Sequence, residues 1–260
     1  MSADDQNHEI PENGDGTRPE CEMHLTDHLE ELRKRLIVSF IAIGVATVGS
    51  YFFSEQLFKL LMAPLLEVMP PKTGLIFTGL AETFFTYLKL SLLSGFFIAF
   101  PVVVYEIWRF TAPGLYAHEK RYVLPFVFFA SVFFIGGALF GYFVVFPFGF
   151  KFFIDFANDF IRPMPTVREY FSFSVRLLFA FGLVFELPVV TAFLSLLGLI
   201  HYKTLVRKRK YAILLAFVVA AVLTPPDVAS QMMMAIPIIL LYEISIIVCR
   251  VFGRKKDPDE

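Results

Sequence analysis

The amino-acid sequence predicts an all-α integral membrane protein with six transmembrane helices and both termini in the cytoplasm. Three observations support this prediction. Hydrophobic residues make up 57% of the chain and its mean hydropathy is +0.65, whereas about 45–50% apolar residues is typical of soluble domains. The apolar residues form six long runs, and Lys and Arg are concentrated in alternate connecting segments.

The six apolar runs are close to the length of about 20 residues, with a range of about 17–25, that a spanning helix needs. They cover residues 36–53, 84–107, 123–147, 173–197, 211–224 and 228–249. The fifth run is short and ends at Pro225 and Pro226, because proline cannot continue a helix. We expect the last two runs to form a tight helical hairpin through locally thin membrane. A re-entrant pair that does not cross the membrane is the alternative.

Positive charge sets the expected orientation of the spans. Sixteen of the 23 Lys and Arg residues lie before the first run, between the second and third, between the fourth and fifth, or after the sixth. The opposite connecting segments hold five. Basic residues are enriched in cytoplasmic loops. This distribution therefore places both termini in the cytoplasm, as an even number of spans requires.

Proline and glycine inside the runs predict how the helices bend and approach one another. Pro101, Pro188 and Pro237 each remove a backbone donor and can kink a helix, so we expect kinked helices that form a curved wall. Gly137 and Gly141 are spaced as a small-xxx-small pair, which permits close approach of a second helix.

The long connecting segments on the less basic side have their own signals. Residues 54–83 contain Pro64, Pro70 and Pro71, and we expect short broken elements there. Residues 148–160 are rich in Phe. This pattern predicts a helix that continues out of the third span and rests in the membrane interface, and a lid or partner surface is the alternative.

Glu186 lies near the middle of the fourth run. A carboxylate at bilayer depth costs about 2.5–3.5 kcal/mol on insertion scales, and acids in such positions are usually functional. In its neutral form Glu186 can donate a hydrogen bond to a substrate or to a partner helix. The alternative is a structural carboxyl group that Thr191 or Ser195 satisfies.

Charged residues crowd the expected cytoplasmic rim in HLEELRKRL at 28–36 and AHEKRY at 117–122. Glu31 can pair with Arg35 one helical turn later, and Glu119 suits the positive end of the next helix dipole. Together they place two carboxylates on one rim, where a carboxylate can hold a guanidinium group through two hydrogen bonds. The sequence leaves open whether Glu31 is free or held by Arg35.

Three other acids have structural explanations. Glu106 and Glu243 lie near the cytoplasmic ends of the second and sixth runs, where an acidic side chain can extend to the interface. Asp227 lies at the outer turn before the sixth run, where we expect it to cap the helix through its side chain.

The sequence offers no enzyme, metal or cofactor site. Cys21 and Cys249 are far apart and form no metal motif, and the five His residues lack ligand spacing. Neither a Gly-Lys-Ser/Thr phosphate loop nor a nucleophile elbow occurs. We therefore expect neither an enzyme nor an ATP-driven pump, and no nucleic-acid partner.

Five separated segments carry a common pattern: HLEELRKRL (28–36), APGLYAHEKR (112–121), YFVVFPFGF (142–150), FAFGLVFELP (179–188) and LTPPDVASQ (223–231). In order and spacing they resemble TatC, the multi-spanning core of the twin-arginine protein translocase. The resemblance defines a membrane domain at 24–252. A disordered acidic tail at 1–23 and a short charged tail at 253–260 are expected outside it.

The resemblance implies a cup-shaped protein of a prokaryotic cytoplasmic (inner) membrane that binds the twin-arginine signal peptides of folded precursor proteins. It implies single-span TatA and TatB partners, a larger complex in which the chain self-associates in membrane lipid, and transport driven by the proton motive force. By family match, Glu31 and Glu119 receive the two signal arginines, and Leu32, Arg33 and Phe110 belong to the same recognition segment.

The family match also implies roles away from the rim. Glu186 would contact a polar residue of a TatA or TatB helix, and Pro64 and Asp227 would be structural residues of the outer loops. The rival function is a proton-coupled small-solute carrier with Glu186 as the relay, although such carriers usually show repeat symmetry, which this sequence lacks.

Overall fold

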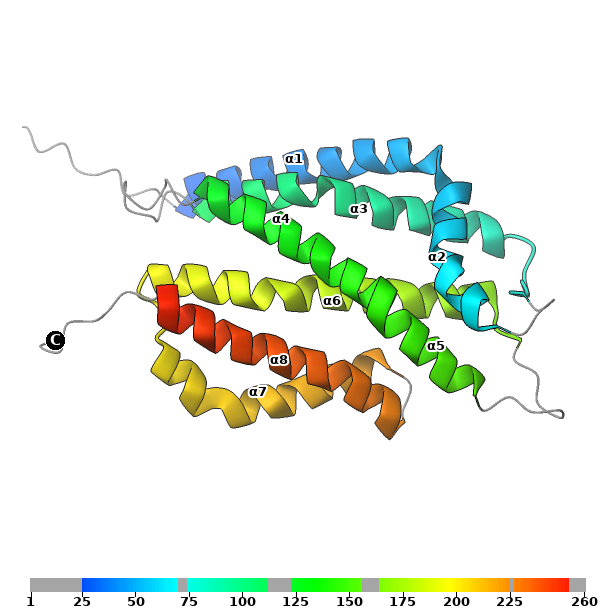
Figure 1. The fold of residues 1–260 in the computed structure, drawn as a ribbon. Helices are drawn as coiled ribbons and strands as arrows, with labels where there is room; N and C mark the ends of the chain where they lie inside the picture. The colour runs from blue at the N-terminus through cyan, green and yellow to red at the C-terminus, as the bar shows by residue number, and fades with distance from the viewer. Residues whose placement is uncertain (1–24, 70–73, 112–122, 156–163, 225–226, 253–260) are drawn as a thin grey trace, which may run out of the picture.

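The computed structural model describes residues 25–69, 74–111, 123–155, 164–224 and 227–252, and these are almost entirely helical (Figure 1). The elements are α1 (Leu25–Tyr51), α2 (Ser54–Val68), α3 (Glu82–Thr111), α4 (Val123–Phe140), the π-helical segment η3 (Gly141–Val145), α5 (Phe146–Ile154), α6 (Val167–Leu196), α7 (Tyr202–Leu223) and α8 (Val228–Phe252). The two tails and the loop that carries Glu119 lie outside the described residues. Within the described ranges, one β-bridge pairs Ile76 with Thr166.

Four helical stretches are long and apolar enough to cross a membrane: α3, the continuous stretch from α4 to α5, α6 and α8. They contain the predicted runs at 84–107, 123–147, 173–197 and 228–249. α1 and α2 together would make a fifth, bent by 83° between them. α7 carries the run at 211–224, but it begins with the basic segment at 203–210 and is not among these stretches.

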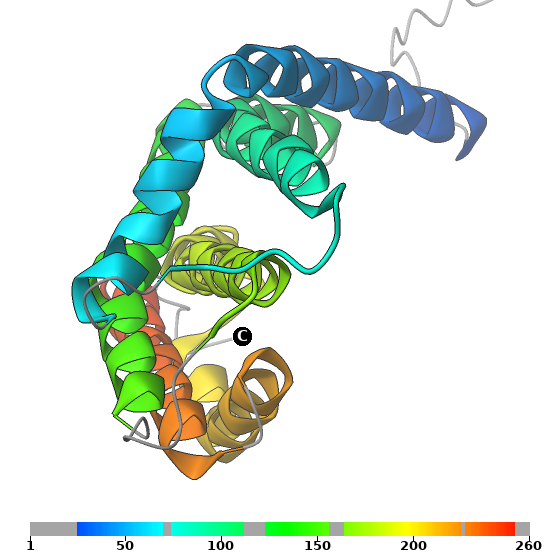
Figure 2. The same ribbon diagram turned by 90° about the vertical axis from the view of Figure 1, so that its right-hand side faces the viewer.

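The helices form a curved wall with one open side, as seen along their axes in Figure 2. α1 packs along α3, α4 packs against α3 and α6, and α8 packs against α6 and α7. The start of α1, the end of α3, the start of α7 and the end of α8 lie at the same end of the molecule (Figure 1). Segments far apart in the sequence therefore meet at this end.

Aromatic side chains fill the contact between α3, α4 and α6. Phe134 of α4 and Phe181 of α6 are fully buried. Phe134 stacks on Phe100 of α3, with ring centroids 3.7 Å apart and ring planes 9° from parallel. Aromatic pairs contribute about 0.5–1.5 kcal/mol beyond the burial of their area, so this contact fixes α3 and α4 to one another.

The predicted close approach at Gly137 and Gly141 is confirmed between α4 and α6. A Cβ atom on Gly137 would overlap the carbonyl oxygen of Phe181 and would lie 2.8 Å from the Cβ of Phe185. A Cβ atom on Gly141 would lie 3.3 Å from the Phe181 ring. Glycine at these positions lets the two backbones approach more closely than any side chain would allow.

We expect Gly137→Ala to lower the melting temperature of the detergent-purified protein, because overpacking a filled contact costs about 1–3 kcal/mol. Gly136→Ala is the matched control, since a Cβ atom there would meet nothing within 4 Å. The measurement is thermal unfolding of both variants beside the wild type. Equal melting temperatures for the two variants would contradict the close packing of α4 on α6.

α2 is one helix of 15 residues that continues through the buried Pro64, so the prediction of short broken elements after the first span is wrong here. Pro64 has no N–H group to donate to the carbonyl of Leu60, four residues earlier. The hydroxyl of Tyr142 donates to that carbonyl instead, at 2.5 Å. The hydroxyl of Tyr170 donates to the carbonyl of Leu61. Two tyrosines thus hold α2 against η3 and α6.

The π-helical segment η3 joins α4 to α5 without a break. Pro147, in the first turn of α5, cannot donate to the carbonyl of Phe143, and its ring would crowd that carbonyl in a regular helix. The wider turn of η3 accommodates this ring. The predicted continuation of the third span is confirmed as far as Ile154, and residues 156–163 lie outside the described part.

Removal of the tyrosine hydroxyls is expected to destabilise the docking of α2. Tyr170→Phe should lower stability by about 0.5–1.5 kcal/mol, the net contribution of one hydrogen bond. Tyr142→Phe should have a smaller effect, because its bond is exposed. Tyr211→Phe, at an exposed position on α7, is the control. If all three variants unfolded at the wild-type temperature, the two bonds would not hold α2.

Glu82 joins the start of α3 to the start of α6. Its Oε2 accepts the backbone N–H groups of Thr78 at 2.7 Å and of Gly79 at 3.1 Å. Its Oε1 accepts the backbone N–H of Arg168 at 2.7 Å. Backbone N–H groups at helix starts have no partner within the helix, so one carboxylate satisfies groups from two separate parts of the chain.

Candidate functional site

Arg35 lies between two carboxylates at the end of the molecule where α1 begins and α3 ends. Its Nη2 donates to Oε1 of Glu31 at 2.9 Å, and its Nη1 donates to Oε2 of Glu106 at 3.2 Å. Glu31 precedes Arg35 by one turn on α1, whereas Glu106 comes from α3, 71 residues away. The packing of α1 along α3 therefore assembles this cluster, which we call the Arg35 cluster.

The Arg35 cluster is largely shielded from solvent. The side chains are 8% exposed for Glu106, 16% for Arg35 and 22% for Glu31. A buried charge is costly unless it is paired, and Arg35 provides the pairing for both acids. Nε of Arg35 is buried without a hydrogen-bond partner among the described residues. Glu31 is thus held by Arg35, which answers the question that the sequence left open.

An aromatic contact lies beside the Arg35 cluster. The ring of His28 stacks on that of Phe110, with centroids 4.3 Å apart and planes 22° from parallel. Leu32 lies one turn after His28 on α1 and is half-buried, whereas Arg33 is exposed. The structure thus brings Phe110 at the end of α3 to the segment that contains Glu31, Leu32 and Arg33.

Glu106 is the member of the cluster that sequence reasoning missed. It was interpreted as an acid extending to the interface, but it is buried and paired across helices. The feature of the sequence that could have indicated a paired acid is the position of Glu106 inside an apolar run, where an acid needs a partner. Its partner is 71 residues away, so no local spacing could identify it.

A second acid-base pair lies at the same end of the molecule. Arg209 near the start of α7 contacts Glu243 of α8 through two bonds, Nε to Oε1 at 2.7 Å and Nη2 to Oε2 at 2.9 Å. These side chains are 45% and 37% exposed. The pair joins α7 to α8 and is more open to solvent than the Arg35 cluster.

Glu186 is half-buried on α6, and its Oε1 is buried without a hydrogen-bond partner in the described part of the chain. The alternative that Thr191 or Ser195 satisfies this carboxyl group is wrong. Thr191 donates to the carbonyls of Leu187 and Pro188, and Ser195 donates to the carbonyl of Cys249. A buried polar atom without a partner costs about 1–3 kcal/mol, so Glu186 has hydrogen-bonding capacity that the described residues do not use.

Asp227 precedes α8, and its Oδ1 accepts the backbone N–H of Ser230 at 2.7 Å. This is the contact of a helix N-cap. Asp227 thus caps the start of α8, and Pro64 lies inside α2. Both α2 and the start of α8 lie at the end of the molecule opposite the start of α1 (Figure 1).

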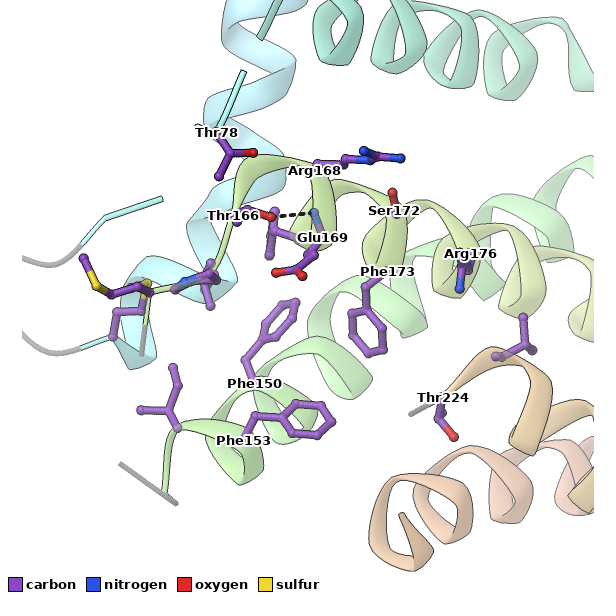
Figure 3. Close-up of a pocket in the computed structure, with 17 residues that line it drawn as sticks. Thr78, Phe150, Phe153, Thr166, Arg168, Glu169, Ser172, Phe173, Arg176 and Thr224 are labelled. Atoms are coloured by element: carbon purple, nitrogen blue, oxygen red, sulfur yellow. Dashed lines mark hydrogen bonds between the residues drawn. The ribbon is translucent and has the colours of Figure 1, made fainter. Parts of the chain in front are cut away.

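A cavity of about 1050 Å³ also lies at that opposite end, between α2, α5, α6 and α7. Figure 3 shows Phe150 and Phe153 of α5 facing Glu169 and Phe173 of α6. Thr166 caps α6 by accepting the backbone N–H of Glu169 at 3.1 Å. None of the sequence-predicted site residues that the structure describes lines this cavity.

Comparison with known proteins places this geometry in a family. The sequence model described as "Sec-independent protein translocase protein (TatC)" matches residues 27–237. The chain belongs to the TatC family. It is 54% identical over 244 residues to the TatC of Desulforapulum autotrophicum, which covers 94% of this chain and 90% of that one. It is 48% identical over 236 residues to the TatC of Magnetococcus marinus, covering 91% and 87%.

Solved structures of TatC share the fold. One, described as the twin-arginine translocase receptor TatC, matches with a TM-score of 0.78 and 42% identity, over 87% of this chain and all of that chain. A second, in the detergent DDM, matches with a TM-score of 0.79 and 41% identity. The family resemblance seen in the sequence is confirmed. The chain is a multi-pass inner-membrane protein of a translocase family, which is not a family of enzymes.

Proposed function

We propose that this TatC protein is the receptor core of a twin-arginine translocase. It binds the twin-arginine signal peptides of folded precursor proteins and, with single-span TatA and TatB, moves them across the membrane at the expense of the proton motive force. The observation that carries this proposal is a guanidinium group held by Glu31 at the rim of the helical wall. Solved relatives described as twin-arginine translocase receptors support it.

The proposed topology has six spans with both termini in the cytoplasm. Its support is the gathering of the start of α1, the end of α3, the start of α7 and the end of α8 at one end of the molecule (Figure 1). The basic residues of the start of α1, of 203–210 and of Arg250 lie at these same ends. In this topology α7 crosses the membrane with α8 as a short hairpin.

The proposed signal-peptide site consists of Glu31 and Glu119, with Leu32, Arg33 and Phe110 beside them. A carboxylate holds a guanidinium group through two parallel hydrogen bonds, and a paired-arginine ligand needs two such groups. Glu31 already accepts one hydrogen bond from the guanidinium group of Arg35, at 2.9 Å. Glu119 lies in the sequence between α3 and α4, and Phe110, near the end of α3, stacks on His28, three residues before Glu31.

The proposed partner contact is Glu186. Within a membrane, a carboxyl group without a partner gains by meeting a polar residue on a neighbouring helix. The unused Oε1 of Glu186 supports a contact with a single-span TatA or TatB helix. Pro64 and Asp227 are proposed as structural residues of the outer side, and the complex as one in which several copies associate in lipid.

The test is the affinity of the purified chain for a twin-arginine signal peptide, compared with the same peptide carrying two lysines. Arginine presents a planar fork to a carboxylate, whereas lysine is a single point charge. We expect the arginine peptide to bind at least about tenfold more tightly, the ratio given by a difference of about 1.4 kcal/mol. Equal affinities would contradict the receptor assignment.

A further inference from the structure

The carboxylate proposed to receive a signal arginine is already occupied by an arginine of the chain itself. Arg35 holds Glu31 at 2.9 Å through Nη2. Because Arg35 follows Glu31 by one turn of α1, its guanidinium group stays within reach of that carboxylate. An incoming guanidinium group must therefore compete with Arg35.

Glu106 provides the second position for the same guanidinium group. Its Oε2 accepts from Nη1 of Arg35 at 3.2 Å, and its side chain, 8% exposed, is the most buried of the three. A buried guanidinium group that lost every anion would carry a large desolvation cost. Glu106 allows Arg35 to release Glu31 without losing its last anionic partner.

We propose that Arg35 is an internal competitor for the arginine-binding carboxylate, and that Glu106 is the residue that retains Arg35 when a signal arginine takes Glu31. This inference rests on the proposed function. In this inference Arg35 and Glu106 set the affinity of the site for the peptide but do not contact the peptide themselves. Competition lowers the affinity for every ligand by the same factor. Arg35 therefore sets how tightly a peptide must bind, and not the ratio between arginine and lysine peptides.

The inference predicts opposite effects for the two partners of Arg35. Glu106→Gln leaves Glu31 as the only carboxylate for Arg35, so the affinity for a twin-arginine peptide should fall roughly three- to tenfold. Arg35→Met with Glu106→Leu removes the competitor and replaces the buried ion pair by apolar groups, a change that proteins often tolerate. The affinity of this double variant should rise by a similar factor for the arginine and the lysine peptide alike.

The experiment is the dissociation constant of a fluorescent twin-arginine peptide for the full chain in detergent, with a melting temperature for each variant. Arg35→Lys is a third variant, because an ammonium group keeps the charge but lacks the two-nitrogen fork that joins the carboxylates. It too should bind the peptide more tightly. Arg209→Gln with Glu243→Gln is the matched control, since it removes an ion pair at the same end and should leave the dissociation constant unchanged.

The outcomes separate the inference from the proposed function. If the wild type prefers the arginine peptide but the Arg35 and Glu106 variants bind as the wild type does, the inference is wrong and the function stands. The inference is also overturned if a folded Arg35→Lys or double variant binds more weakly, because Arg35 would then be a favourable part of the site. If the wild type binds both peptides equally, the proposed function is contradicted instead.

Discussion

Glu31→Ala together with Glu119→Ala is expected to reduce the affinity for a twin-arginine signal peptide by roughly a hundredfold. Each substitution removes a hydrogen bond to a charged group, which contributes about 1.5–3 kcal/mol. At a partly exposed rim the lower value applies to each residue, and two losses of about 1.5 kcal/mol amount to about two factors of ten. The measurement is site-specific crosslinking of a labelled signal peptide to membranes that carry the double variant.

Glu30→Ala is the matched control for that experiment. Glu30 is exposed on the same turn of α1 as Glu31. Its replacement by alanine removes one negative charge from this end of the molecule, as Glu31→Ala does. We expect crosslinking to Glu30→Ala at the wild-type level. Specific crosslinking that persists undiminished in the double variant would contradict the assignment of both residues to the site.

Glu186→Ala is expected to abolish co-purification of TatA and TatB with this chain while leaving the binding of signal peptide intact. The physical reason is that the unused Oε1 of Glu186 has no partner within the described structure, so a partner helix is its proposed source of a hydrogen bond. Glu186→Gln retains a donor and an acceptor and should preserve part of the association. The measurement is the amount of each partner recovered with the tagged chain from detergent-solubilised membranes.

The stability of the isolated chain distinguishes a partner contact from a structural one. Because Glu186 makes no hydrogen bond in the described structure, Glu186→Ala should leave the melting temperature unchanged or raise it. Glu169→Ala, an exposed acid in the first turn of the same helix, is the control for association. If TatA and TatB are recovered with the Glu186→Ala variant at the wild-type level, the proposed contact through Glu186 is contradicted. Movement of a small solute by the purified chain alone in liposomes would favour the carrier alternative.

Local patterns in the sequence were enough to locate most of the fold. The long apolar runs correspond to α3, to α4 with α5, to α6 and to α8, because burial in lipid acts on every residue of a span. The spacing of Gly137 and Gly141 predicted a close approach of a second helix, because both glycines lie on one helix face. The structure identifies that helix as α6. The pairing of Glu31 with Arg35 was visible because both lie on one helix, four residues apart.

Contacts between distant segments could not be predicted in this way. Pro64 suggested a broken segment, yet α2 is continuous, and the hydroxyl of Tyr142 satisfies the carbonyl of Leu60, 82 residues earlier, that Pro64 leaves free. Glu106 was interpreted as an interfacial acid because its partner Arg35 lies on another helix. The proposed role of Glu119 stays a prediction, because that residue lies outside the described structure.

The bonds of Glu82 have a mechanical consequence for the whole wall. One carboxylate accepts backbone N–H groups before α3 and at the start of α6, so these bonds oppose sliding of the two spans past one another at that end. We therefore expect a rearrangement that begins around Arg35, at the opposite end of the molecule, to reach this end as a tilt of the helices and not as a translation. Glu82 would then act as a pivot for the spans that carry the proposed signal-peptide site.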